Sequence, residues 1–379
     1  MNRRTFLRSV LASVAGSVLL GRADADVGAA VVDSGAAATL PGPFPGRVVE
    51  VHHPGCVVNH RVVGEPVRDM VGRGLRELTG APDATEAWRR FFEPGDVVGI
   101  KVNPVGAPDA ISSYALVHEV VAGLRSAGIK SQDIFVFDRY RSYLRRAGYP
   151  DNVPDGVRCD AVCDDYDPVQ LGMAGYDPDV YREIELVSAR EQEPTDDRAR
   201  RSHLALIVSR QVNKIVNLPV LKDHEYAGVT LALKNMSHGF VNNVARSHAT
   251  NATTACNTFI PAIVSMPAIR SKVVLHVLDG TRAVFDGGPT GTDRTTWTNA
   301  SLYFATDPVA LDHIGWEAID AKRRAMRLPV VARTLVRHVN EPVRPANGYR
   351  QPQHIALAGA LGLGVFERAR INYHRVVIR

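Results

Sequence analysis

Strand-like and helix-like segments alternate along the chain from residue 47 onward, and this order constrains the fold more than any other feature. Short β-branched or apolar runs predict buried strands, and apolar residues that recur every three or four positions predict helices. The expected strands are 47–51, 96–102, 134–137, 214–220, 273–278 and 300–305. The expected helices are 67–78, 85–92, 112–127, 226–238, 257–266 and one that begins at Asp307-Pro308. This order predicts an α/β fold with a largely parallel sheet flanked by helices, in a single main domain.

The N-terminus has the pattern of an export signal. The run Asn2-Arg3-Arg4-Thr5-Phe6-Leu7 is a twin-arginine pattern, and Ala23-Asp24-Ala25 follows as an A-x-A cleavage site. The apolar run between them, about 11 residues, is too short to cross a bilayer of roughly 30 Å as a helix. An uncleaved amphipathic anchor remains the alternative.

These features divide the chain into three parts. We expect a twin-arginine signal peptide at 1–25, a flexible leader rich in Ala, Gly and Pro at 26–46, and the α/β domain at 47–379. The expected partner during export is the twin-arginine translocase, and the expected location is the periplasm or the extracellular space. No membrane span is expected after cleavage.

The charge of the mature chain gives no case for nucleic-acid binding. The full chain has 45 Lys and Arg against 40 Asp and Glu, a formal charge of +5. Removal of residues 1–25 lowers these counts to 41 and 39, so the mature charge is +2. A protein this close to neutral lacks the electrostatic footprint of a nucleic-acid binder. The runs Arg139-Tyr140-Arg141 and 198–201 have acidic neighbours and are expected to form solvated surfaces.

The four cysteines, Cys56, Cys159, Cys163 and Cys256, do not define a cluster or a disulfide framework. Four cysteines allow three pairings, and a chain of this length buries a large core without disulfides. Cys159 and Cys163 have no second cysteine pair at the spacing of a zinc ribbon or an iron–sulfur cluster.

Polar residues repeatedly follow the predicted strands. Ligands of open parallel sheets collect beyond the carboxyl ends of the strands. The residues at such ends are Lys101, Asn103, Asp138, Lys222, His224 and Asp279. This repetition predicts that they line one shared polar cleft.

The segment 221–240, LKDHEYAGVTLALKNMSHGF, combines burial with charge. Its apolar stripe consists of Val229, Leu233, Met236 and Phe240, and its polar stripe of Thr230, Lys234 and His238. The apolar stripe is expected to pack on the sheet. Two alternatives remain for the polar stripe: Lys234 reaches solvent and His238 lies at the helix end, or both face a ligand.

A transition metal is a further possibility. The candidate ligands are His224, His238, His248 and Cys256. Imidazole and thiolate suit zinc, copper or nickel. Their spacing matches no recognised ligand motif, so surface or core histidines remain the alternative.

Several separated motifs resemble the domain-of-unknown-function family 362. They are GDVVGIKVN (95–103), the strand that ends in Asp138, VNLPVLKDH with LALKNMSHG (216–239), Asp279-Gly280, GGP (287–289) and TDPVALD (306–312). Some members of that family carry a ferredoxin-like segment with clustered cysteines. This chain lacks that segment, so the resemblance implies no iron–sulfur cluster here. The fold is also distantly similar to that of the lactate racemase-like nickel enzymes.

Two functional hypotheses follow. In the first, the protein is an exported enzyme that holds a small anionic substrate between Lys101, Lys222 and Lys234, in a cleft that also contains Asp138. His224 is its general acid or base, and Asn103, Asn235 and Asp279 are the candidate cofactor-binding residues. In the second, the protein is a periplasmic ligand- or cofactor-binding protein that uses the same cleft without turnover. No G-x-G-x-x-G fingerprint and no G-x-S-x-G elbow is present to support a dinucleotide-dependent enzyme or a serine hydrolase.

Overall fold

The computed structural model describes residues 40–187, 192–193, 195–248, 255–334 and 352–379. All of them belong to one compact unit that spans 36–379. The predicted signal peptide and residues 26–39 of the predicted leader lie outside the described residues.

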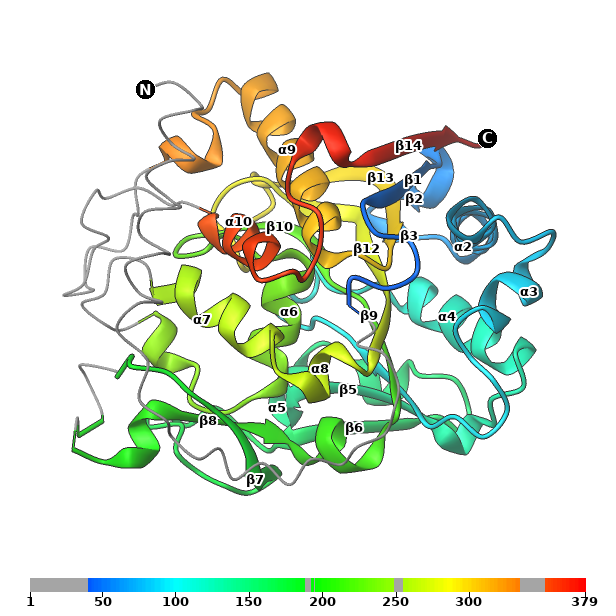
Figure 1. Ribbon diagram of the computed structural model, residues 1–379. Coiled ribbons are helices and arrows are strands. Elements are labelled where there is room, and N and C mark those ends of the chain that lie inside the picture. Colours follow the sequence, from blue (N-terminus) through cyan, green and yellow to red (C-terminus); the bar gives the residue numbers. More distant parts are fainter. Residues whose placement is uncertain (1–39, 188–191, 194, 249–254, 335–351) are drawn as a thin grey trace. The chain divides into compact units, whose positions relative to one another are not determined.

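A mixed, mostly parallel sheet forms the centre of this unit (Figure 1). Its strands follow in the order β14 (Asn372–Val377), β1 (Arg47–His52), β13 (Thr296–Ala305), β12 (Val273–Val284), β9 (Lys214–Asn217), β4 (Val98–Lys101), β5 (Ile134–Tyr140) and β6 (Arg158–Cys163). Along this path, within the described residues, only β13 runs against its neighbours. A further strand, β10 (Val220–His224), pairs in parallel with β12 and carries the antiparallel β11 (Gly228–Val229). The predicted α/β class is confirmed.

Helices cover both faces of the sheet (Figure 1). One face carries α2 (Gly64–Thr79), α3 (Ala84–Arg89) and α4 (Tyr114–Ser126); the other carries α6 (Leu231–Phe240), α7 (Ala255–Val264), α8 (Pro267–Arg270), α9 (Pro308–Ala325) and α10 (Gln353–Ala360). Successive strand residues point to opposite faces. In β5, Val136 therefore packs with α2–α4, whereas Phe135 and Phe137 join the core on the α6 side. None of the described helices combines the length and apolar character that a membrane span requires.

Smaller elements complete the fold. They are α5 (Arg141–Arg146), the pair β2 (Val57–Val58) and β3 (Arg61–Val62), and the pair β7 (Tyr176–Glu183) and β8 (Arg201–Ala205). The sequence predicted no regular structure between 150 and 203. β6, β7 and β8 lie there because tertiary pairing overrides a polar composition.

The segment after β9 differs from the prediction. The expected strand 214–220 is divided at Leu218-Pro219, and the expected helix 226–238 begins only at Leu231. Residues 220–229 instead form a β10–β11 hairpin, in which His224 pairs with Gly228 at a φ of 80°. The helix start is set from outside the segment, since Asp312 of α9 accepts the backbone N–H groups of the first turn of α6.

The packed domain begins earlier than predicted. The leader was expected to reach residue 46, but Leu40 is buried and its N–H donates to the carbonyl of Arg270 at 3.1 Å. The N–H of Gly46 donates to Asp307 at 2.8 Å. Asp307 also caps α9, accepting from Val309 and Ala310, as its position before Pro308 predicted. Residues 40–46 are thus held by the end of α8 and the start of α9.

Candidate functional site

A cavity of about 380 Å³ lies at the carboxyl ends of β4 and β5, beside β10 and α6. Its lining includes these predicted residues: Lys101, Asn103, Asp138, Lys222, His224, Lys234, Asn235, His238 and His248. The convergence expected for strand-end residues of one sheet is therefore found. Asp279 and Cys256 do not line this cavity.

Successive side chains of β10 point to opposite sides of the strand. Lys222 and His224 lie on the cavity side. Asp223, between them, points away and accepts the N–H of Gly288 at 2.7 Å. Lys222 and His224 thus lie within a strand, and not after its end as predicted.

The ammonium of Lys101 has a full set of acceptors within the protein. Its ammonium lies 2.5 Å from Asp138 and donates to the carbonyl of Val102 at 2.7 Å and to Asn235 at 3.2 Å. These three acceptors use the three N–H bonds of an ammonium. Lys101 is therefore committed to the scaffold, contrary to the prediction that it supplies a free cation to the substrate.

Lys222 is buried with two acceptors and no exposed surface. Its Nζ donates to Asn103 Oδ1 at 2.8 Å and to the carbonyl of Val105. Burial, with the positive charges of Lys234 and Lys101, lowers the pKa of Lys222 to about 7. A neutral amine has two N–H bonds, which fit the two acceptors and leave its lone pair free.

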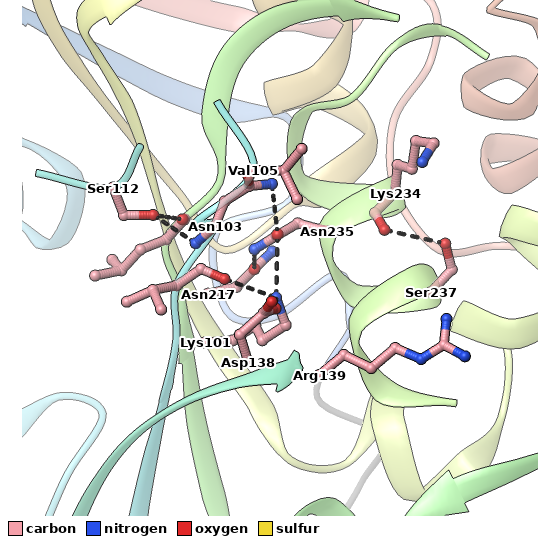
Figure 2. A network of polar contacts seen from close by, with 12 residues as sticks. Lys101, Asn103, Val105, Ser112, Asp138, Arg139, Asn217, Lys234, Asn235 and Ser237 are labelled. Atoms are coloured by element: carbon pink, nitrogen blue, oxygen red, sulfur yellow. Dashed lines mark hydrogen bonds and ion pairs between the residues drawn. The ribbon is translucent and has the colours of Figure 1, made fainter. Parts of the chain in front are cut away.

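A chain of asparagines orients these acceptors (Figure 2). Asn103 donates to the side-chain oxygen of Asn235 at 3.0 Å, and Asn235 donates to that of Asn217 at 2.7 Å. Asn217 donates to the carbonyl of Ala232 at 3.2 Å. This direction turns the carbonyl oxygens of Asn103 and Asn235 toward Lys222 and Lys101.

Lys234 has a different environment from the other two lysines. Its side chain is 7% exposed, and within the described part of the chain no hydrogen-bond or ion-pair partner meets its ammonium. Burial lowers the pKa of Lys234 to about 8, although the nearby Cys256 opposes this shift. Figure 2 shows the side chain extending away from the asparagine chain.

Arg139 adds a second buried charge, 5% exposed, to the same cavity. Its guanidinium donates to the hydroxyl of Tyr176 at 3.1 Å and to Gln170 at 3.0 Å, both neutral groups. The ion pair of Lys101 and Asp138 cancels, so Arg139 and Lys234 leave the cavity with an excess of positive charge. Such a cavity favours an anion.

His224 is held in one orientation by its own turn. Its Nδ1 accepts the backbone N–H groups of Tyr226, at 3.1 Å, and Ala227, at 3.3 Å. An accepting Nδ1 places the proton of the neutral ring on Nε2. His224 can therefore act as a proton donor.

Three of the four predicted metal ligands meet. The side-chain ligand atoms of His238, His248 and Cys256 lie within 4.8 Å of one another. His224 is outside this group, although its ring stacks on that of His248 at 5.3 Å between centroids.

The structure places two predicted sets of residues elsewhere than expected. Asp279 does not line the cavity, and its oxygens accept from Ser113, the N-cap residue of α4, and from Thr281 of β12. Arg139 and Tyr140 were expected on a solvated surface, but both are buried against the cavity. Both residues belong to β5, which continues for two residues beyond Asp138, so they lie in the sheet and not in a surface loop.

The fold and the site define an α/β protein with a cation-lined cavity at the carboxyl ends of its parallel strands. The chain belongs to the family described as Domain of unknown function (DUF362), whose model matches residues 98–317. That span contains every predicted site residue. No curated protein sequence matches the chain.

Two solved structures are similar to this one. The lactate racemase apoprotein from Thermoanaerobacterium thermosaccharolyticum is 10% identical with a TM-score of 0.37, over 71% of this chain and 57% of that one. A protein from Thermotoga maritima is 11% identical with a TM-score of 0.38, over 70% of this chain and 60% of that one. The chain thus spans little more than half the length of either structure.

Proposed function

We propose that this protein is an exported enzyme that binds a small carboxylate or phosphate compound in the cavity and transfers a proton on it. Lys222 is the base and His224 the acid. The observation that carries the proposal is a fully buried lysine whose pKa is about 7, in a cavity with unbalanced positive charge.

The charges of the cavity support an anionic substrate. Among the described residues, Lys234 offers an ammonium without a partner, and the guanidinium of Arg139 donates to neutral groups. Burying such charges is costly unless an opposite charge joins them. A bound anion supplies that charge.

The geometry of β10 supports proton transfer. Lys222 and His224 are two residues apart on one face of the strand, which separates their Cα atoms by roughly 6–7 Å. At pH 7 about half of the Lys222 amines are neutral, so a lone pair is available to take a proton. The Nε2–H of His224 hydrogen-bonds the substrate and gives it a proton, which leaves the ring as an imidazolate while Lys222 is an ammonium. Return of a proton from the ammonium to the ring restores both groups, so the total charge of the pair does not change.

The N-terminal pattern supports export through the twin-arginine translocase to the periplasm or beyond. The twin arginines, the short apolar run and the A-x-A site occur in the order that a removable signal requires.

The test is solvent deuterium uptake. The protein is incubated in deuterated water with a panel of small carboxylates and phosphates. Mass spectrometry then measures the deuterium content of each compound. We expect deuterium to enter one class of compound, and Lys222→Met and His224→Gln to abolish the uptake. Anions that raise the melting temperature without any exchange would instead support a binding protein without turnover.

A further inference from the structure

We propose that His238, His248 and Cys256 form a binding site for a first-row transition metal ion, with zinc as the reference ion. The test of this site does not depend on the proposed reaction, because metal binding is measured without a substrate. It is carried by the placement of the three side chains and by the hydrogen bonds around Ser247.

Three separate elements bring the ligands together. His238 lies on α6, His248 follows the short 3₁₀ helix η6 (Ala245–Ser247), and Cys256 lies on α7. Their ligand atoms are within 4.8 Å of one another. A tetrahedral zinc ion separates its nitrogen and sulfur ligands by roughly 3.3–3.6 Å. Side-chain movements of about 1 Å would therefore bring the three ligand atoms to these separations.

Ser247 determines which atoms are available. Its hydroxyl donates to the carbonyl of Val244 at 2.7 Å, the shortest of its contacts. The hydroxyl oxygen then accepts from His238 Nε2 at 2.9 Å and from His248 Nδ1 at 3.2 Å. With its proton on Nδ1, His248 presents a bare lone pair on Nε2.

That lone pair is the second independent observation for the site. His248 Nε2 is buried and has no hydrogen-bond partner among the described residues. An unsatisfied buried nitrogen is costly, and a metal ion would supply the missing partner. The sulfur of Cys256 lies within 4.8 Å of the ligand atoms of both histidines.

Hydrogen bonds of His238 and Cys256 must give way to the ion. His238 Nε2 donates to Ser247, His238 Nδ1 lies 2.9 Å from the hydroxyl of Ser237, and the thiol of Cys256 donates to the carbonyl of Ser247. A metal ion ligates the thiolate, so binding releases the thiol proton.

The site has an open side toward the cavity. His238 and His248 line the cavity, whereas Cys256 does not. Three protein ligands leave a fourth tetrahedral position, as in catalytic zinc sites. His238, His248 and Lys234 all line the cavity, so an anion bound there would meet both the ion and the ammonium.

The experiment titrates the metal-free full chain with Co²⁺ and Zn²⁺. We expect one ion per chain, and with Co²⁺ a near-ultraviolet thiolate charge-transfer band together with strong visible bands of a tetrahedral site. Cys256→Ser should lose the charge-transfer band, and both Cys256→Ser and His248→Gln should weaken zinc binding at least about 100-fold. Cys56→Ser, which changes a buried cysteine in η1 (Pro54–Cys56), is the matched control and should bind as the parent does.

Two results would overturn the site. One is the absence of a charge-transfer band when the parent protein binds Co²⁺. This test uses the parent protein alone, so it does not depend on the folding of a variant. The other is a band that persists in Cys256→Ser, because the thiolate then comes from another cysteine. Circular dichroism of each variant establishes that a loss of binding is not a loss of fold.

Discussion

Gly239 of α6 lies directly against the side chain of Lys101. A Cβ atom at Gly239 would overlap Cε of Lys101 and lie 2.6 Å from its Nζ. This close approach leaves space for the buried lysine to reach Asp138. The ion pair of Lys101 and Asp138 therefore requires a residue without a Cβ atom at position 239.

Gly239→Ala should destabilise the protein by about 1–3 kcal/mol, because Lys101 must leave its position beside Asp138. The matched control is Gly72→Ala in α2, where the nearest atom to a new Cβ is 3.9 Å away. That change should stabilise by up to about 1 kcal/mol, the helix preference of alanine over glycine. Chemical denaturation measures both, and an equal gain from the two variants would contradict the close contact.

The two lysines Lys101 and Lys234 should respond in opposite ways to removal of their charge. Lys101→Met strands the buried Asp138 and should lower the free energy of unfolding by about 3–5 kcal/mol. Lys234→Met removes an ammonium without a described partner and keeps most of its packing, so the empty protein should be at least as stable as the parent. Denaturant unfolding at one pH compares them. A large loss in Lys234→Met would show that its charge is structural.

An anionic ligand should stabilise the parent more than Lys234→Met. At a hundredfold excess over its dissociation constant a ligand adds about 2.7 kcal/mol to the parent. Thermal melts of both proteins, with and without the anions that take up deuterium, measure the difference in stabilisation. Equal stabilisation of both proteins would place the anion away from Lys234.

Lys222 should titrate near neutral pH. The chain has only seven lysines among its 45 Lys and Arg residues, so their side-chain nuclear magnetic resonance signals can be resolved after selective labelling. We expect one signal with a midpoint at about pH 7, which Lys222→Met removes, and one at about pH 8 from Lys234. A Lys222 midpoint at its ordinary value near 10.5 would disprove the proposed base.

The same shift predicts how stability depends on pH. Since the pKa of Lys222 is lower in the folded protein, the unfolded chain binds more protons between pH 7 and 10.5, and stability rises with pH across that interval. From pH 7.5 to 9.0 the contribution of Lys222 is about 2 kcal/mol. Lys234 and Lys101 face this amine with like charge, and Asp138 and Asp223 with opposite charge. Urea unfolding at both pH values should give a smaller rise for Lys222→Met than for the parent.

Replacing Arg3 and Arg4 with lysine should keep the precursor in the cytoplasm, because the arginine pair is what the translocase reads. Cell fractionation and immunodetection measure the outcome. Arg8→Lys conserves the charge outside the pair and should export normally. Unchanged export of the double variant would refute the signal.

Local sequence determined the class of fold and much of the lining of the cavity. Alternation at periods of 2 and 3.6 residues located most strands and helices, because the buried face of each element must be apolar whatever its partner. The polar stripe of α6 placed Lys234 and His238 on the cavity, and the end of a parallel strand did the same for Asp138. Asp307 before Pro308 predicted its own cap, since that bond is made within one turn.

Only the tertiary structure decided which of these charges are free. Lys101 and Lys234 look alike in the sequence, yet one meets Asp138 from a neighbouring strand and the other meets no described partner. The start of α6 depends on Asp312, some eighty residues later in the chain. The hydrogen bonds of Ser247 likewise depend on how three elements pack. Charge compensation acts through space between residues distant in sequence, so no local pattern records it.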